Sequence, residues 1–263
     1  MDPALRAAAS GMQAQQTRTE VIANNLANVN TTGFKRSRAH FEDLLYQTIK
    51  GPATLGSRDA DQLPEIQLGR GVRLNAIQRM NAQGSLEQTQ RPLDLAVEGE
   101  GYFQVQLPNG NMAYTRDGSF QVSDQGMLVT NAGYAVHPPI QVPRDLSELT
   151  ISSTGIVNAK RIDGSTETIE LGRIELARFS NPSGLTSLGE NLFVETSASG
   201  EAIRGFAQDE GMGRIAQGYL EASNVEIVQE MVDMITAMRA YEINSKAIKT
   251  SEDMSQVANS LVR

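Results

Sequence analysis

Residues 2–33 read DPALRAAASGMQAQQTRTEVIANNLANVNTTG, and this stretch predicts a terminal helix with an apolar seam. Asp2 is a favourable N-cap, and Pro3 suits the first helical position, where its missing N–H costs nothing. The seam follows the alternating spacing of three and four that is typical of heptads, with two polar residues in its middle: Leu5, Ala8, Met12, Gln15, Thr19, Ile22, Leu26 and Val29. Asparagines and Gly33 then end the helix.

The C-terminal segment predicts a second, longer helix. Ser223 and Glu226 have the spacing of a capping box at a helix start. Two apolar stripes follow: Ile227, Met231, Met234, Met238 and Tyr241, and then Ile243, Ala247, Thr250, Met254, Val257 and Leu261. We therefore expect a coiled-coil seam in which apolar residues of these stripes meet Leu5, Met12, Ile22 and Val29.

Between the termini, the apolar period changes from helical to strand-like. Apolar and polar residues alternate over residues 93–97 and 103–107, and an apolar run continues over 169–176. Turn signals such as Pro108-Asn109-Gly110 and Asn131-Ala132-Gly133 separate the runs. This pattern predicts an antiparallel β module.

The predicted fold class is α+β, with four segments. Residues 1–49 and 219–263 form a helical coiled-coil domain, and residues 74–218 form an all-β antiparallel domain. Residues 50–73 carry several glycines and prolines and few apolar residues, which predicts an extended segment between the two domains.

Composition excludes several classes of function. The chain has 263 residues and a formal charge of -8, which argues against a protein that neutralises phosphates on nucleic acid or anionic lipid. It has no cysteine, which excludes disulfides and thiolate metal sites. We find no signal peptide and no run of ~18 apolar residues, so we expect neither Sec export nor membrane insertion.

The sequence shows no catalytic, metal-binding or cofactor-binding constellation. The Gly-x-Gly pairs do not extend to a dinucleotide-binding fingerprint, and the two histidines, His40 and His137, lack zinc-ligand spacing. Glu98 and Glu100 are the only carboxylate pair that suggests chemistry, because two acids can flank a glycosidic bond. A peptidoglycan hydrolase is therefore the enzyme hypothesis, although both acids lie between glycines in an apparent turn.

Contact between the two terminal helices alone is not expected to stabilise them, so each needs further partners. Burying an apolar seam residue gives ~1.5–2 kcal/mol, whereas ordering each helical residue costs ~1–2 kcal/mol. Neighbouring copies in an open helical array would supply further contacts, and the methionines suit contacts with slightly different neighbours. Two alternatives remain: the methionines are core residues of a two-helix bundle, or the chain is a soluble coiled-coil interaction protein.

Several passages resemble one protein family. Residues 23–35, ANNLANVNTTGFK, resemble the N-terminal signature of bacterial flagellar rod and hook proteins. Further similar passages are LDLAVEGEGYFQV at 93–105, YTRDGSFQV at 114–122, GENL at 189–192, and QGYLEASNVEIVQEMVDMITAMRAYEINSKAI at 217–248. The chain is more similar to rod subunits than to the larger hook subunit in its length, its compact β module and its residues 41–47. A hook-type subunit remains an alternative.

The resemblance implies a structural subunit of the distal rod that assembles into a helical tube, transmits torque and needs no cofactor. The implied partners are further copies, proximal rod subunits, the hook protein, the surrounding peptidoglycan and outer-membrane rings, and the type III export apparatus. The implied location is the basal body in the periplasm, reached without a cleaved signal peptide. The assembly residues of the signature are Asn24, Asn25, Leu26, Asn28, Gly33 and Phe34. Its asparagines either bridge to a neighbouring subunit or simply terminate the helix.

Overall fold

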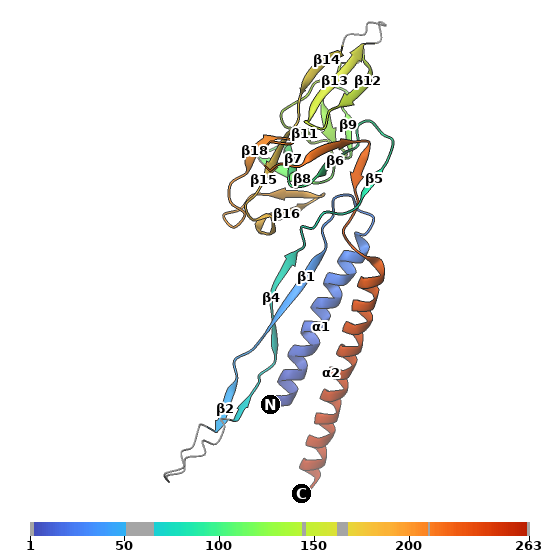
Figure 1. The fold of residues 1–263 in the computed structure, drawn as a ribbon. Coiled ribbons are helices and arrows are strands. Elements are labelled where there is room, and N and C mark those ends of the chain that lie inside the picture. The colour runs from blue at the N-terminus through green and yellow to red at the C-terminus, as the bar shows by residue number, and fades with distance from the viewer. Residues whose placement is uncertain (1–2, 51–65, 144–145, 162–167, 210, 262–263) are drawn as a thin grey trace, which may run out of the picture. The chain divides into compact units, whose positions relative to one another are not determined.

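The computed structural model describes residues 3–50, 66–143, 146–161, 168–209 and 211–261. The chain runs from helix α1 (Pro3–Ala27), through a long series of strands, to helix α2 (Ile227–Leu261) (Figure 1). The N-terminal helix, the antiparallel β region and the C-terminal helix confirm the predicted α+β class.

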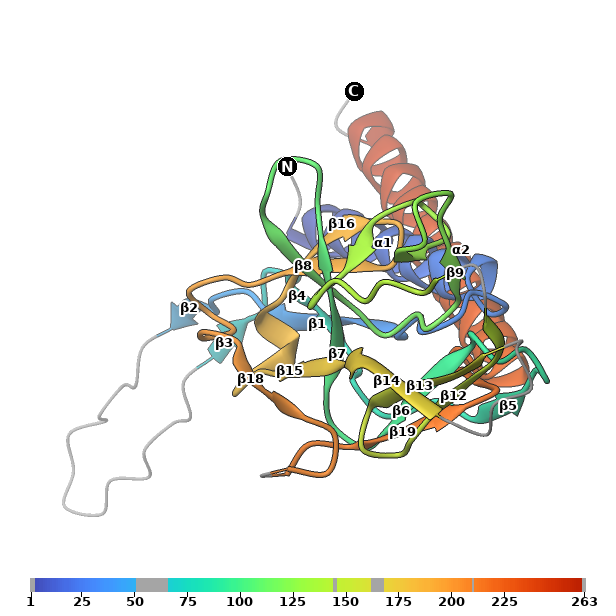
Figure 2. The ribbon, with the colours of Figure 1, turned by 90° about the horizontal axis from the view of Figure 1, so that it is seen from above.

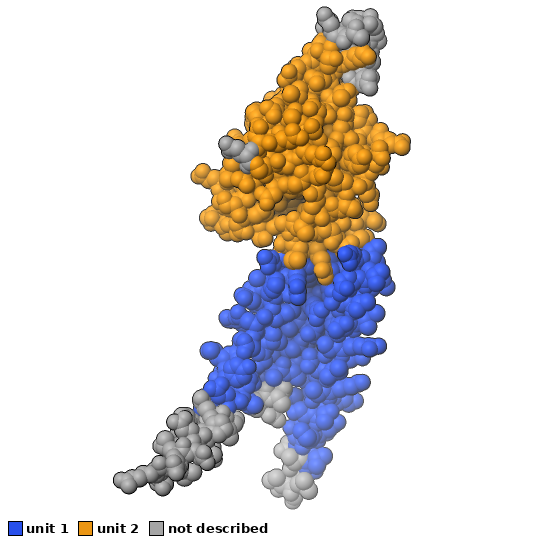
Figure 3. Space-filling model, viewed as in Figure 1, with its two compact units in different colours: residues 1–26, 37–78, 226–263 blue, residues 27–36, 79–225 orange. Residues whose placement is uncertain are grey.

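The chain divides into two compact units (Figure 3). The helical unit comprises residues 1–26, 37–78 and 226–263, and the β unit comprises residues 27–36 and 79–225. The sequence pattern predicts residues 27–36 as part of the helical domain, whereas the structure groups them with the β unit. The cause is a set of hydrogen bonds and a buried ion pair that are described below.

The helical unit contains two helices and two short ladders. Strands β1 (Ser37–Asp43) and β4 (Val72–Arg79) pair with each other, as do β2 (Gln47–Lys50) and β3 (Ile66–Leu68). Most of the predicted extended segment, residues 51–65, lies outside the described residues.

The helix α2 begins at Ile227, later than its predicted cap at Ser223. The Ser223 hydroxyl accepts a hydrogen bond from the N–H two residues on, at 3.3 Å, and so caps no helix. The Asn224 carboxamide donates to the carbonyl oxygens of Met80 and Ala82, both at 2.9 Å. These bonds hold residues 223–225 against residues 80–82 within the β unit, and the helix starts only after them.

The strands of the β unit follow the alternating runs expected from the sequence. The strands are β5 (Leu86–Gln88), β6 (Leu95–Glu98), β7 (Tyr102–Gln106), β8 (Met112–Thr115), β9 (Phe120–Val122), β10 (Leu128–Thr130), β11 (Ala135–Val136), β12 (Leu146–Ile151), β13 (Ile156–Arg161), β14 (Thr168–Arg173), β15 (Glu175–Arg178), β16 (Thr186–Gly189), β17 (Leu192–Val194), β18 (Ile203–Phe206), β19 (Arg214–Gln217) and β20 (Tyr219–Glu221). The largest sheet has the order β16-β17-β8-β7-β11-β10-β9, with β15 joining β7 to β18. Strands β12, β13 and β14 form a separate antiparallel sheet (Figure 2).

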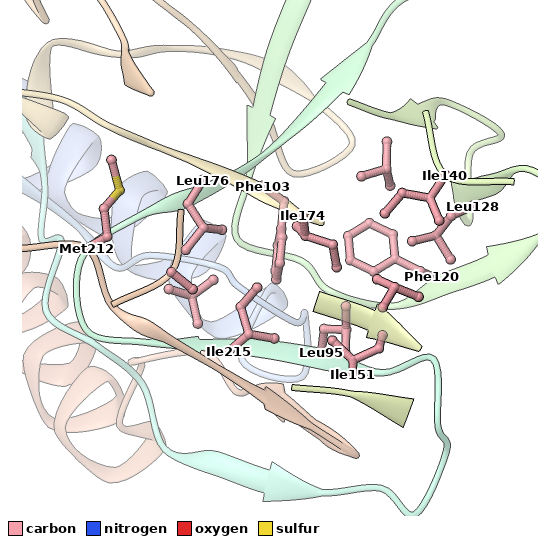
Figure 4. Close-up of a cluster of buried hydrophobic side chains, with 14 residues drawn as sticks. Leu95, Phe103, Phe120, Leu128, Ile140, Ile151, Ile174, Leu176, Met212 and Ile215 are labelled. Atoms are coloured by element: carbon pink, nitrogen blue, oxygen red, sulfur yellow. The ribbon is translucent and has the colours of Figure 1, made fainter. Parts of the chain in front are cut away.

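The core of the β unit lies on both faces of β7. Phe103 packs edge-on against Phe120, with ring centroids 5.1 Å apart, in the main apolar cluster (Figure 4). Tyr102 points to a second cluster and packs edge-on against Phe179 and Phe193. Adjacent residues of a strand point to opposite faces, so two buried faces explain why β7 is apolar at successive positions.

Candidate assembly surface

The helices α1 and α2 pack side by side and antiparallel within the helical unit (Figure 1). Arg18 Nη2 lies 3.0 Å from Asp233 Oδ1, and Asn25 Nδ2 lies 3.1 Å from Glu230 Oε2. Further along, a Cβ built on Gly11 would lie 2.9 Å from the carboxamide of Asn244. Partner numbers on α2 rise as those on α1 fall, which is the register of an antiparallel pair.

The side of α2 that faces α1 is polar or small at its most buried positions. Its most buried residues are Glu230, Ala237 and Ser251, and Met234, Asn244 and Ile248 are half-buried. Glycine, alanine and serine allow close approach of two helix backbones, but they bury little apolar surface. The α1–α2 contact is therefore close but contributes little hydrophobic stabilisation.

The apolar residues of α2 are instead exposed. We call this set the apolar α2 surface; its members are 44–76% exposed and are Ile227, Val228, Met231, Val232, Ile235, Met238, Tyr241, Ile243, Met254 and Val257. Val228 and Ile235 each precede a buried residue, Glu230 and Ala237, by two positions. Two positions correspond to about 200° around a helix, so both side chains point away from α1.

The predicted seam residues are therefore more buried on the N-terminal side than on α2. Ile22 is buried, and Leu5, Met12 and Val29 are half-buried. On α2 only Met234 is half-buried, and the side chain of Leu261 lies outside the described residues. The remaining α2 residues belong to the apolar α2 surface and are 44–66% exposed. Their role in contacts between copies stays a prediction.

Asn25 is the most deeply buried asparagine of the signature. Its side chain is buried, its Oδ1 accepts the N–H of Ser37 at 2.9 Å, and its Nδ2 donates to the Ser37 carbonyl at 2.8 Å. The same Nδ2 reaches Glu230 of α2. A single carboxamide thus joins the end of α1, the start of β1 and the first turn of α2. Its neighbour Asn24 is exposed, and Leu26 is half-buried.

The rest of the signature forms a turn within the β unit. Asn28 accepts hydrogen bonds from the backbone N–H and the hydroxyl of Thr31, both at 3.2 Å. Gly33 has a φ of +68°, and a Cβ there would lie 2.9 Å from the backbone of Arg116. Only glycine combines this conformation with so close an approach. Phe34 is half-buried, so the aromatic ring is not the deeply buried anchor of this segment.

The anchor is Lys35, which belongs to a buried charge cluster with Glu221 and Arg116. The Lys35 ammonium pairs with Glu221 Oε1 and donates to the Ala82 carbonyl at 2.9 Å. Arg116 Nη1 lies 3.2 Å from Glu221 Oε2. The side chain of Glu221 is 0% exposed, and the side chains of Lys35 and Arg116 are 2% and 7% exposed.

Backbone groups complete the cluster around these three charges. The Gly84 N–H donates to Glu221 Oε1 at 3.0 Å, and the Arg116 guanidinium donates to the carbonyl oxygens of Val97 and Gly99 at 3.2 and 2.8 Å. Buried charges are tolerated when they are paired and hydrogen-bonded in this way. The cluster thereby fixes residues 33–35 to the end of β20.

Burial changes the ionisation of groups in this cluster. Desolvation lowers the pKa of Lys35 below its usual 10.5, although the adjacent Glu221 carboxylate opposes the change. Desolvation also raises the pKa of the Tyr102 phenol above 10, and Arg116, which lies 5.1 Å from the ring centroid, limits the increase.

Lys35, Arg116 and Glu221 are not among the site residues predicted from the sequence. Each lies in a passage that carries the family resemblance: residues 23–35, 114–122 and 217–248. Lys35 is the only charged residue of its passage, but Arg116 is followed by Asp117, and the passage that contains Glu221 has six other charged residues. No periodicity indicates that the three charges meet, because they are far apart in sequence.

Glu98 and Glu100, the two acids of the enzyme hypothesis, each form an ion pair at the surface. Glu98 Oε2 lies 2.7 Å from Arg214, and Glu100 Oε2 lies 3.7 Å from Arg178. Each acid thus has its own guanidinium partner, an arrangement that does not favour joint action on a glycosidic bond. Across the described residues we find no group of three or more metal-ligating side chains, and no described helix is long and apolar enough to cross a membrane.

Comparison with known proteins gives matches along most of the chain. Residues 5–35 match the flagella basal body rod protein model, residues 96–159 the flagellar hook protein FlgE/F/G D1 domain, and residues 216–261 the C-terminal model of flagellar basal body rod FlgEFG proteins.

Curated relatives match almost end to end. Flagellar basal-body rod protein FlgG of Borreliella burgdorferi is 52% identical over 262 residues, covering 99% of this chain and 98% of the relative. FlgG of Caulobacter vibrioides is 48% identical, covering 98% of each chain. The flagellar hook-basal body complex protein FlhP of Bacillus subtilis is 33% identical, covering 94% of each. These matches confirm the resemblance found in the sequence, and the chain belongs to the family of flagellar basal-body rod and hook proteins.

Proposed function

We propose that this chain is a structural subunit of the distal rod of the bacterial flagellum. Copies of it assemble into a helical tube through their terminal helices, and the tube transmits torque from the motor to the hook. The observation that carries the proposal is the apolar α2 surface, which a single chain leaves exposed and of which Val228 and Ile235 point away from α1. Relatives of nearly equal length are named basal-body rod proteins.

The energetics favour burial of this surface by other copies. Burying the exposed half of an aliphatic or methionine side chain contributes about 0.7–1.5 kcal/mol, so the set contributes several kcal/mol. Contacts that repeat without closing on themselves produce a helical array, in which each α2 meets α helices of neighbouring copies in a coiled-coil arrangement.

The strand ribbon of the helical unit supports a second contact. Leu74 and Ile77 of β4 are 41% and 53% exposed. Residues three apart in a strand point to opposite faces, so both faces of the ribbon carry an exposed aliphatic side chain. A two-stranded ribbon is marginal by itself. We therefore propose that this ribbon braces neighbouring subunits.

On this proposal the partners are copies of the chain, proximal rod subunits, the hook protein, the surrounding peptidoglycan and outer-membrane rings, and the flagellar type III export apparatus. The location is the part of the basal body that spans the periplasm, reached without a cleaved signal peptide. The role is structural rather than enzymatic. Immunogold labelling of purified basal bodies separates the rod from the hook, because the label lies between the rings in the first case and beyond them in the second.

The test of assembly uses two matched substitutions of exposed valines. Val228→Asp places a charge on the apolar α2 surface, and Val122→Asp places one on the β unit, where the valine is 40% exposed. We expect Val228→Asp to abolish self-association in light scattering and to abolish motility, with unchanged circular dichroism of the monomer. We expect Val122→Asp to assemble. Normal assembly of Val228→Asp would show that copies join without the apolar α2 surface and would refute this part of the proposal.

A further inference from the structure

The exposed surface of α2 is rich in thioethers. Met231, Met238 and Met254 are 51%, 50% and 64% exposed, whereas Met212 in the β unit is 9% exposed. The chain has no cysteine and no tryptophan, so these thioethers are the groups that a mild two-electron oxidant attacks first.

Met238 is accessible from a second direction. A hollow of about 340 Å³ in the helical unit is lined by Met238, Tyr241 and Glu242 of α2 and by Gln16 and Thr19 of α1. A molecule as small as hydrogen peroxide enters such a space readily, because it is little larger than water. The sulfur of Met238 is therefore approachable both from the helix surface and from this hollow.

We propose that Met231, Met238 and Met254 form a redox-sensitive modification site that controls assembly, with peroxides as the oxidant. The proposal rests on the proposed function, because it requires that the apolar α2 surface joins copies of the chain. In each reaction the sulfur lone pair attacks one peroxide oxygen. An S–O bond forms, the O–O bond breaks, and the second oxygen leaves as water after proton transfer. The sulfur loses two electrons and the peroxide gains them.

The product no longer suits the contact. A sulfoxide carries a strongly polar S–O group, and burying it without a donor is unfavourable. Met231 and Met238 are seven residues apart, which places their side chains on one side of the helix, about 10 Å apart. Two sulfoxides there introduce polarity at both ends of a two-turn stretch that also contains Val232 and Ile235. Oxidation before assembly therefore blocks subunit addition, and methionine sulfoxide reductases restore it.

The experiment treats the purified full-length chain with hydrogen peroxide, removes the peroxide with catalase, and quantifies each sulfoxide by peptide mass spectrometry. We expect oxidation of Met254, Met231 and Met238 well ahead of Met212. The concentration needed for assembly, measured by light scattering and sedimentation, should rise about tenfold or more. Treatment with sulfoxide reductases and thioredoxin should reverse this increase.

Substitution by leucine provides the control, because leucine keeps the apolar volume and lacks the sulfur. The triple variant Met231→Leu, Met238→Leu, Met254→Leu should assemble at the same concentration with or without peroxide. A Met80→Leu variant, which changes a methionine of the β unit that is 39% exposed, should stay as sensitive as the unchanged chain.

The outcomes separate this inference from the proposed function. If the oxidised chain carries the three sulfoxides and assembles normally, or if the triple variant loses assembly on peroxide treatment, the inference is wrong while the rod assignment stands. If the untreated chain does not assemble at any concentration, the proposed use of the apolar α2 surface fails, and the inference fails with it.

Discussion

The substitution Glu221→Gln is expected to destabilise the β unit more than the removal of either cation that the carboxylate binds. Lys35 and Arg116 supply two positive charges and Glu221 one negative charge, all nearly inaccessible to water. Glutamine preserves the shape of the side chain but leaves two buried cations without an anion. Breaking a buried pair in this way costs about 3–5 kcal/mol.

The comparison variant is Lys35→Met, which leaves one cation and one anion. The Arg116–Glu221 pair and the bond from the Gly84 N–H remain, and the desolvation of an ammonium is removed. The loss is one charge-assisted hydrogen bond to Glu221 and one donor to a carbonyl, about 1.5–3 kcal/mol. Urea unfolding followed by the near-ultraviolet circular dichroism of the tyrosines measures both variants. A smaller loss for Glu221→Gln than for Lys35→Met would refute the charge-balance reasoning.

The stabilities of Glu221→Gln and of the unchanged chain should also depend differently on pH. The pKa of Lys35 is lowered in the folded chain, so on raising the pH the folded state releases this proton before the unfolded state, and the contribution of Lys35 to stability rises towards pH 10.5. The Glu221 carboxylate raises the pKa of Lys35, so its removal lowers this pKa further. In Glu221→Gln, stability therefore begins to increase with pH at a lower pH. The difference in unfolding free energy between Glu221→Gln and the unchanged chain should therefore shrink between pH 7 and pH 9.5.

Three further substitutions test other parts of the structure. Gly33→Ala should lower stability more than Gly110→Ala in thermal unfolding, because both glycines have positive φ but only Gly33 has backbone within 3 Å of the added Cβ. The backbone strain costs about 1–3 kcal/mol at either position, and the clash adds to it at Gly33. Equal losses of stability would contradict the close approach. Asn25→Asp places a carboxylate beside buried Glu230, which should raise the pKa of the new side chain and make the variant more stable as the pH falls from 7 to 5; stability that falls over this range would refute the contact. Tyr102 has a raised pKa, so the unfolded state releases its proton first and stability should fall as the pH rises above 10, an effect that Tyr102→Phe should reduce in urea titrations.

Much of the fold follows from local sequence signals. Pro3 at the first helical position marks the observed start of α1, and the alternating runs around Leu95 and Phe103 became β6 and β7. The positive φ of Gly33 also follows locally, because the stop signal and the turn lie within a few residues. Such features depend on neighbours in the chain, and the period of apolar residues reports them directly.

The start of α2 could not be predicted in this way. Ser223 and Glu226 have the spacing of a capping box, but Asn224 bonds to carbonyl groups of residues 80 and 82 instead. These partners are far away in sequence, and their hydrogen bonds override the local preference for a helix start.

The sequence alone determined that both ends of this protein are helical, that the middle is an antiparallel β region and that the chain resembles rod and hook proteins. Only the tertiary structure decided which stripe of α2 meets α1 and which stays exposed, because periodicity shows that a helix has an apolar side but not what covers it. It also decided that Lys35, Arg116 and Glu221 meet, since the pairing of buried charges depends on the three-dimensional path of segments that lie far apart in the chain.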